Sequence, residues 1–234
     1  MKKYLMILFS SILAGFCITF GATVYLMCLN ASGGEFVGKF IGACMFTIGL
    51  FTIIHFNFWL YTGKIGYVLD NKPMYLLDCF ICFVGNLIGS FGLSSLIKLT
   101  SVGDKLHTQA TPIVEAKLNS SWYSILIMSM MCGVMIYLAV EGHKRCKYSI
   151  GKVLFATMPI ILFILCGFEH VVANITYFTY AGSLNWQGFG YFVLMFVGNA
   201  LGSIIFDGII KLVNYFAKSD STNSTTINSN NKDK

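Results

Sequence analysis

Charged residues are scarce in this chain of 234 residues: Lys, Arg, Asp and Glu together make up 11% of it. Soluble domains carry about 25% charged residues, so the composition excludes an ordinary water-soluble fold. Hydrophobic residues account for 56% of the chain, which predicts an integral membrane protein. The formal net charge of +6 does not indicate a nucleic-acid partner, because no soluble domain is predicted that could present a basic face.

Several motifs of other membrane proteins are missing from the sequence. It contains no HExxH metal-ligand motif, no evident nucleophile paired with a histidine and no nucleotide-binding motif, so neither an enzyme nor a primary pump is predicted. Of the eight cysteines, Cys79 and Cys82 form a lone C-x-x-C, which favours packing over metal or redox chemistry. No cofactor is predicted. The Asn-Pro-Ala triplets of water channels are also missing, although a neutral-solute channel for water or ammonia stays open as the alternative function.

Six apolar stretches are long enough to cross the hydrocarbon core of a bilayer, which takes roughly 20 helical residues. They are Tyr4–Leu29, Phe36–Leu60, Tyr75–Leu99, Trp122–Val140, Lys152–Tyr180 and Gly190–Tyr215. The first is too long for the apolar region of a signal peptide and is interpreted as a span. We therefore predict a six-span domain over residues 1–216, followed by a polar, disordered cytoplasmic tail over residues 217–234.

The basic residues predict the orientation, since six crossings place both termini on one side. Twelve of the 16 Lys and Arg residues fall on that side: Lys2, Lys3, Lys64, Lys72, Lys144, Arg145, Lys147, Lys152, Lys211, Lys218, Lys232 and Lys234. The other side has Lys39, Lys98, Lys105 and Lys117. Loops rich in Lys and Arg stay in the cytoplasm, so both termini are predicted to be cytoplasmic in the cell (inner or plasma) membrane.

The chain also contains an internal repeat. GNLIGS at Gly85–Ser90 returns as GNALGS at Gly198–Ser203, an offset of 113. GLFTIIHFN at Gly49–Asn57 and GFEHVVAN at Gly167–Asn174 are aligned with an offset of 118. Three spans repeated once have opposite orientations because three is odd. The halves, about 4–99 and 113–216, therefore predict the inverted-repeat design of transporters and channels.

Polar residues interrupt the second and fifth apolar stretches at mid-membrane depth. They are Thr52, His55 and Asn57 in one stretch and Glu169, His170 and Asn174 in the other. Charge at that depth is costly, and non-helical backbone is tolerated there only against protein or a cavity. We therefore predict that both helices break and that these polar residues face a shared passage. His55 is interpreted as structural or interfacial.

Taken together, these motifs resemble those of the formate/nitrite transporter family. GLFT in the second stretch, GN-x-x-G in the third, EAK before the fourth, GFEH-x-x-AN in the fifth and GN-x-x-GS in the sixth occur in family order over about Ile12–Phe216. The resemblance implies a homopentamer of aquaporin-like protomers in a lipid bilayer, each with its own pore. It also implies small monovalent anions of weak acids as substrates: formate first, then nitrite, hydrosulfide, acetate or lactate.

The resemblance assigns roles to four residues of the second half. His170 matches the pore histidine of the family, and Lys117 in EAK matches a lysine of the outer vestibule. Phe163 matches an aromatic residue of a hydrophobic constriction. Asn174 matches the asparagine that supports the broken fifth helix.

Other positions match the family less closely. Phe51 and Phe56 fall where the second-span break supplies bulky apolar residues, and Ile136 is assigned with them to the hydrophobic constrictions. Asn57 lies near the place where relatives often have a pore threonine. Gly133 stands where several relatives have an asparagine facing the histidine. These two departures leave the identity of the substrate open.

The remaining polar residues are interpreted as structural. Glu169 is adjacent to His170 and so points elsewhere, while Asn86 and Asn199 are expected to brace the helices through hydrogen bonds to backbone groups. In the pore, Lys117 would attract the anion, and a low dielectric would favour its protonated, neutral form. His170 would relay the proton or only donate a hydrogen bond. Channel and proton symporter both stay open.

Overall fold

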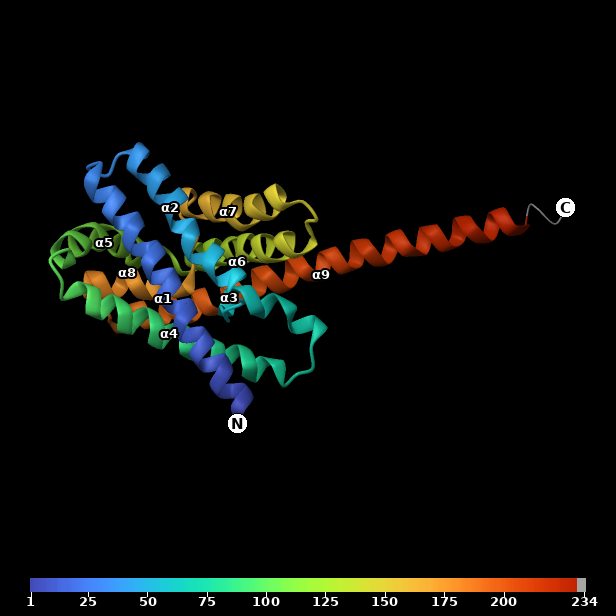
Figure 1. The fold of residues 1–234 in the computed structure, drawn as a ribbon, viewed down its shortest axis with the longest axis horizontal. Helices are drawn as coiled ribbons and strands as arrows, with labels where there is room; N and C mark the ends of the chain where they lie inside the picture. The colour runs from blue at the N-terminus through green and yellow to red at the C-terminus, as the bar shows by residue number, and fades with distance from the viewer. Residues whose placement is uncertain (231–234) are drawn as a thin grey trace.

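The structure, a computed structural model, describes the backbone of residues 1–230 and the side chains of residues 1–218. All regular secondary structure in the described chain is helical (Figure 1). The elements are α1 Lys2–Ala31, α2 Phe36–His55, α3 Tyr61–Lys64, the 3-10 helix η1 Ile65–Asp70, α4 Tyr75–Lys98, α5 Gly103–Leu118, α6 Trp122–Arg145, α7 Ser149–Leu165, α8 Val171–Ala181 and α9 Trp186–Asn230. The prediction of an all-α protein is confirmed.

Among the described residues, five helices are long and apolar enough to cross a membrane: α1, α2, α4, α6 and α9 as far as Lys218. The fifth predicted span is divided into α7, an apolar helix of 17 residues, and the shorter α8. Large apolar side chains on these helices, such as Phe9, Phe80 and Ile205, face outward. Bilayer lipid tolerates such a surface, whereas water does not. The chain is a multi-pass membrane protein.

The second predicted span is interrupted at the last of its three polar residues. Gly49 lies inside α2, where it packs against the backbone carbonyl of Cys17, and the helix continues to His55. The chain then turns at Asn57, which has a left-handed φ of 54°, and α3 begins at Tyr61. Asparagine is one of the few residues other than glycine that adopts this conformation readily. The chain thus leaves helical geometry at Asn57, one of the polar residues at which the interruption was predicted.

The helices pair in two equivalent groups. α1 packs on α2 and α4, and α6 packs on α7 and α9. The second glycine of each GN-x-x-G motif permits the close approach: a side chain on Gly89 would clash with the carbonyl of Ile12, and one on Gly202 with the carbonyl of Met130. These two contacts occupy equivalent places in the two groups.

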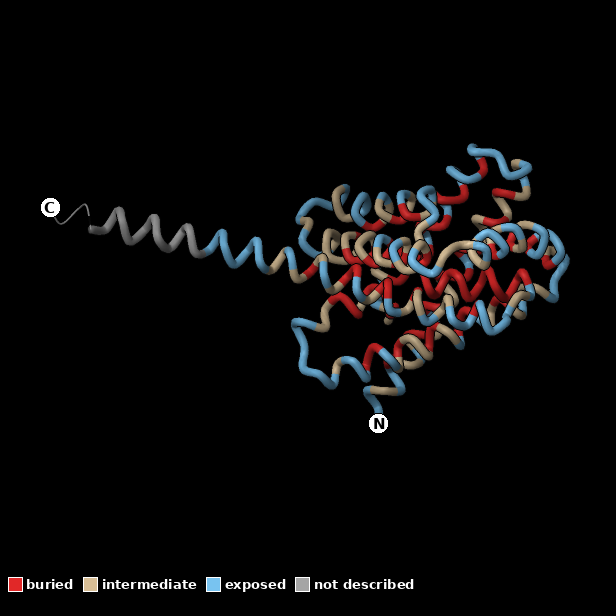
Figure 2. The backbone as a smooth tube through the Cα atoms, turned by 180° about the vertical axis from the view of Figure 1, so that it is seen from behind, coloured by how far each residue is buried: buried red, intermediate tan, exposed pale blue. Residues whose placement is uncertain are grey.

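A helix between the third and fourth predicted spans was not anticipated. α5 buries Leu106, Ala110 and Val114, which recur every four residues along one helix face. That face packs on α8 and α1. Every residue of α8 is buried, so this short helix lies in the centre of the bundle (Figures 1 and 2).

The last helix, α9, continues beyond the bundle (Figure 1). The backbone is described as helical as far as Asn230, so most of the segment 217–234 continues α9. Residues 231–234 lie outside the described part of the chain. A disordered cytoplasmic tail stays a prediction.

Candidate substrate pathway

His170 is held in one ring orientation at the start of α8. Its Nδ1 accepts a hydrogen bond of 3.1 Å from the backbone N–H of Ala173, and its Nε2 lies 2.9 Å from Oγ1 of Thr62. Because the amide can only donate, Nδ1 carries the lone pair, and the neutral ring has its proton on Nε2. That proton is donated to the Thr62 hydroxyl. The ring is buried, with 2% of the residue exposed.

The non-helical segment before His170 is fixed by Asn199 of α9. The Nδ2 of Asn199 donates to the carbonyls of Glu169 and Ser129, both at 2.8 Å. Its Oδ1 accepts from the backbone N–H of Val171 at 3.0 Å. One side chain therefore satisfies backbone groups on both sides of the break, which hydrocarbon could not do.

Asn86 of α4 makes the equivalent set of bonds at the first break. Its Nδ2 donates to the carbonyls of Ser11 at 2.8 Å and Trp59 at 3.0 Å. Its Oδ1 accepts from the backbone N–H of Tyr61 at 2.8 Å. Asn86 and Asn199 therefore both bridge a helix break to a neighbouring helix.

These bonds fix the alignment of the two breaks. Tyr61 and Val171 donate to equivalent asparagines, and Asn57 and Gly167 both have a left-handed φ, of 54° and 70°. Both pairs are 110 positions apart, whereas the asparagines themselves are 113 apart. The offset of 118 that aligned Gly49 with Gly167 was therefore wrong for this segment.

Glu169 turns away from His170 into a buried polar cluster. Its Oε2 lies 2.5 Å from the ammonium of Lys117 on α5 and accepts a 2.8 Å hydrogen bond from Nδ2 of Asn174. The two charged side chains are 13% and 7% exposed. Lys117 therefore has a carboxylate partner, and its charge is largely compensated.

A cavity of about 100 Å³, which we call the His170 cavity, adjoins this cluster. It is lined by Tyr25, Lys117, Phe163, His170, Asn174 and Tyr177, among others. The ring of Phe163 stacks on His170, with the centroids 6.0 Å apart. The structure thus brings four of the predicted site residues together.

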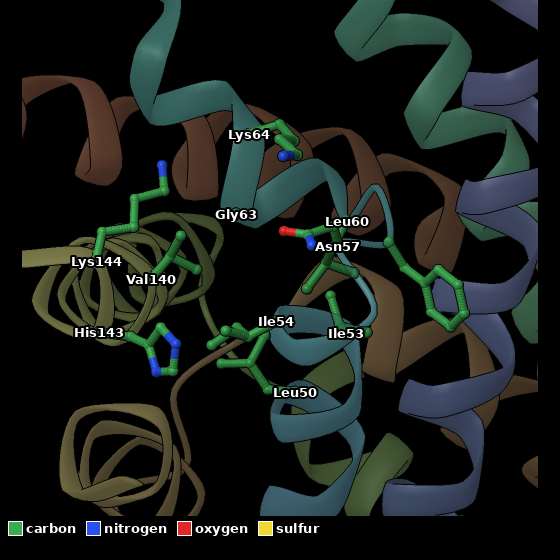
Figure 3. A pocket seen from close by; sticks show the side chains of 11 residues that line it. Leu50, Ile53, Ile54, Asn57, Leu60, Gly63, Lys64, Val140, His143 and Lys144 are labelled. Carbon is green, nitrogen blue, oxygen red and sulfur yellow. The ribbon is translucent and has the colours of Figure 1, made fainter. Parts of the chain in front are cut away.

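A second cavity, of about 140 Å³, is lined by residues of α2, α3, α6 and the first break (Figure 3). We call it the Lys64 cavity; its lining includes Leu50, Asn57, Leu60, Lys64, His143 and Lys144. Of the described residues, none lines both cavities. Thr62 connects them, because it lies between Leu60 and Gly63 in sequence and its hydroxyl meets His170.

The two cavities are related by the internal repeat. With an offset of 110, their lining residues pair as Ile53 with Phe163, Ile54 with Ile164, Asn57 with Gly167, Phe58 with Phe168, Leu60 with His170, Gly63 with Ala173 and Lys64 with Asn174. Leu60 thus occupies the place equivalent to His170, and Lys64 the place equivalent to Asn174. The cavities share a backbone plan and differ in their polar side chains.

Four predicted site residues lie elsewhere. Phe51 stacks on His55, with ring centroids 4.0 Å apart, and Phe56 is 68% exposed. Gly133 packs against the backbone carbonyl of Asn199, where no side chain fits, and Ile136 is buried in the core. None of them is among the residues that line either described cavity. The shifted alignment of the second span explains why Phe51 and Phe56 lie outside these two cavities.

His55 and Asn57 are separated by the turn after α2. His55 is exposed at the helix end, where its Nδ1 donates to the carbonyl of Phe51 at 2.8 Å. Asn57 lines the Lys64 cavity. Sequence reasoning missed Thr62, Leu60 and Lys64, although aligning NFWLYTGK at Asn57–Lys64 with GFEHVVAN would have found them.

Comparison with known proteins agrees with this architecture. The family model described as Formate/nitrite transporter matches residues 1–213. The chain belongs to the formate/nitrite transporter family. The resemblance predicted from the motifs is confirmed.

Relatives of this formate/nitrite transporter family member include the formate channel BtFdhC of Bacillus thuringiensis, 30% identical over 192 residues that cover 76% of this chain and 72% of the relative. The uncharacterized transporter YrhG of Bacillus subtilis (strain 168) is 29% identical over 197 residues, or 78% and 74% of the two chains. A solved pentameric formate channel with formate bound has the same fold, with a TM-score of 0.74 at 20% identity over 93% of this chain and 98% of that one. These relatives are transporters and channels.

Proposed function

We propose that this protein is a channel or transporter for small monovalent anions of weak acids, with formate as the first candidate and nitrite, hydrosulfide, acetate and lactate as further ones. The main support for the proposal is the hydrogen bond between His170 and Thr62. This contact lies between two cavities whose lining residues occupy equivalent positions in the two repeats. The similarity to a formate channel of Bacillus thuringiensis supports this substrate class.

The proposed architecture is a six-span inverted repeat over residues 1–216. In it, α2 with α3 and α7 with α8 each form one interrupted span. The equivalent bonds of Asn86 and Asn199 and the paired cavity linings support this reading. The Lys and Arg distribution supports cytoplasmic termini, which places the Lys64 cavity on the cytoplasmic side of a cell membrane and Lys117 on the outer side.

A bare anion cannot cross the apolar partition between the cavities cheaply, since burying an unpaired charge costs several kcal/mol. We propose that the substrate crosses as its neutral acid. Nδ1 of His170 already accepts from Ala173, so a second proton on the ring would break that bond. The proton therefore enters with the substrate, and His170 and Thr62 offer hydrogen-bond partners to the neutral acid. Acidifying the source side then increases the flux.

The test is uptake of radiolabelled formate, nitrite and sulfide by proteoliposomes over a range of pH. His170→Asn is the informative variant, because asparagine also caps a helix and can accept from Ala173 but offers no imidazole N–H to Thr62. We expect formate uptake to fall about tenfold or more, the scale of one hydrogen bond to a reacting group. His55→Asn, outside both cavities, leaves uptake unchanged. Uptake that is indifferent to pH and carries a full charge current would show that the anion crosses in its charged form.

A further inference from the structure

Two lysine side chains line the Lys64 cavity, and neither forms an ion pair with a described carboxylate. Lys64 ends α3, and Lys144 lies in the last turn of α6; both line the cavity. Within residues 1–218, no carboxylate oxygen lies within 4.0 Å of either ammonium. Lys117 of the His170 cavity, by contrast, is paired with Glu169 at 2.5 Å. Of the lysines that line the two cavities, those without an ion pair to a described carboxylate are therefore on the Lys64 side.

Aromatic rings hold both ammonium groups in place. The Nζ of Lys64 lies 4.9 Å from the ring centroid of Trp59, and the Nζ of Lys144 lies 3.8 Å from that of Tyr67. Such contacts position a cation without neutralising it. The positive charges of Lys64 and Lys144 repel each other, whereas the carboxylates of Glu141 and Asp70 attract Lys144 from beyond ion-pair distance. An anion between the two ammonium groups would relieve their repulsion.

The two carboxylates that attract Lys144 are both engaged elsewhere. Asp70 forms an ion pair with Lys211, with 2.7 Å between the charged atoms. Glu141, three residues before Lys144, accepts hydrogen bonds from the hydroxyl of Tyr67 at 2.8 Å and from Nε of Arg145 at 2.7 Å. The Arg145 contact is also an ion pair. Glu141 therefore compensates Arg145 first, and it does not line the cavity.

The rest of the lining suits a small oxyanion. The carboxamide of Asn57 and the side chain of Lys64 border the space on one side, with Val140 and Lys144 across from them (Figure 3). Leu50 and Ile53 supply apolar wall. A cavity of about 140 Å³ accommodates a molecule no larger than about benzene, so a nucleotide or a peptide is excluded by size.

We propose that the Lys64 cavity is a binding station for a small monovalent oxyanion of the carboxylate or nitrite class, held by Lys64, Lys144 and the carboxamide of Asn57. The station lies on the opposite side of the Thr62–His170 contact from Lys117. It rests on the proposed function, to which it adds a second anion site with a stronger positive charge than the first. In the repeat alignment, Lys64 occupies the position in the first half that Asn174 occupies in the second, so this cavity has a charged lysine where the other has an asparagine.

Binding is measured by the fluorescence of Trp59 in a Trp122→Phe/Trp186→Phe protein, where Trp59 is the remaining one of three tryptophans. Sodium formate is titrated at constant ionic strength into protein in phosphatidylcholine vesicles, so that no lipid headgroup carries a net negative charge. We expect a saturable change. Lys144→Met raises the half-saturating concentration roughly threefold to tenfold, the effect of removing one partly solvated charge. Lys147→Met, an exposed lysine three residues on, leaves it unchanged.

Transport provides the second readout. With oriented vesicles, Lys64→Met and Lys144→Met each raise the half-saturating formate concentration from the Lys64 side and leave that from the Lys117 side unaltered. A titration without saturation, or one that both lysine variants leave unchanged, overturns the station. Saturable, lysine-dependent binding in vesicles that carry no flux supports the station and overturns the proposed function. Formate flux that does not depend on Lys64 or Lys144 supports the proposed function and overturns the station.

Discussion

Two residues with opposite charge set the electrostatics of the His170 cavity. Lys117 and Glu169 form a buried pair, and Asn174 donates to the same carboxylate oxygen. A buried pair gains little over an apolar replacement, but breaking it leaves a charge without a partner. The pair therefore matters for stability.

This arrangement predicts a non-additive effect on stability. Glu169→Gln keeps an acceptor for Asn174 but strands the ammonium of Lys117, and we expect a loss of about 3 kcal/mol or more in the free energy of unfolding. Lys117→Met/Glu169→Gln together should cost less than Glu169→Gln alone. Thermal unfolding in detergent measures both.

The partly exposed pair formed by Glu141 and Arg145 supplies the control, because 57% of the Arg145 side chain and 17% of the Glu141 side chain are exposed. Arg145→Met is expected to change the free energy of unfolding by about 0.5 kcal/mol or less. If the double variant at Lys117 and Glu169 were less stable than Glu169→Gln alone, the pair would not be the cause.

At the scale of elements, close helix contacts depend on single glycines. Gly89 in α4 faces the backbone of α1, and a side chain there would meet the carbonyl of Ile12. Gly92, one turn further along α4, has nothing within 4 Å of the position that a Cβ would take. One helix therefore holds a constrained glycine and an unconstrained one.

Gly89→Ala is expected to destabilise the protein by about 1–3 kcal/mol, since the backbones must move apart. Gly92→Ala is expected to be neutral or stabilising by up to about 1 kcal/mol, because alanine has the higher helix propensity. Unfolding temperatures in detergent compare the two variants. Equal destabilisation by both would contradict the close packing of α1 on α4.

For the whole molecule, we expect a homopentamer. The solved channel with the same fold is pentameric, and α4 and α9 of this chain expose an apolar groove with Phe80, Phe91 and Phe189 in its wall. Native mass spectrometry in mild detergent should give about 130 kDa, five copies of the 26.0 kDa chain. A monomer or another closed ring as the dominant species would refute this assembly.

The sequence by itself determined the membrane class, the family and four residues of the His170 cavity. Hydrophobic runs identify spans because a helix needs about 20 apolar residues to cross the bilayer. GFEH-x-x-AN is a contiguous motif and can be recognised without any knowledge of distant contacts. His170 and Asn174 lie within that motif, and Lys117 lies in a short motif of its own. These features depend on neighbours in the chain.

The tertiary structure decided what depends on distant contacts. The first break lies at Asn57, where the backbone is left-handed. Asn86 stabilises it through hydrogen bonds to Trp59 and Tyr61, which are 27 and 25 positions away in the chain. The pairing of Lys117 with Glu169 joins residues 52 apart in the chain. Lys64 and Lys144 meet in one cavity because α3 packs on α6. Spatial proximity across the bundle, rather than local sequence, sets the charge of each cavity.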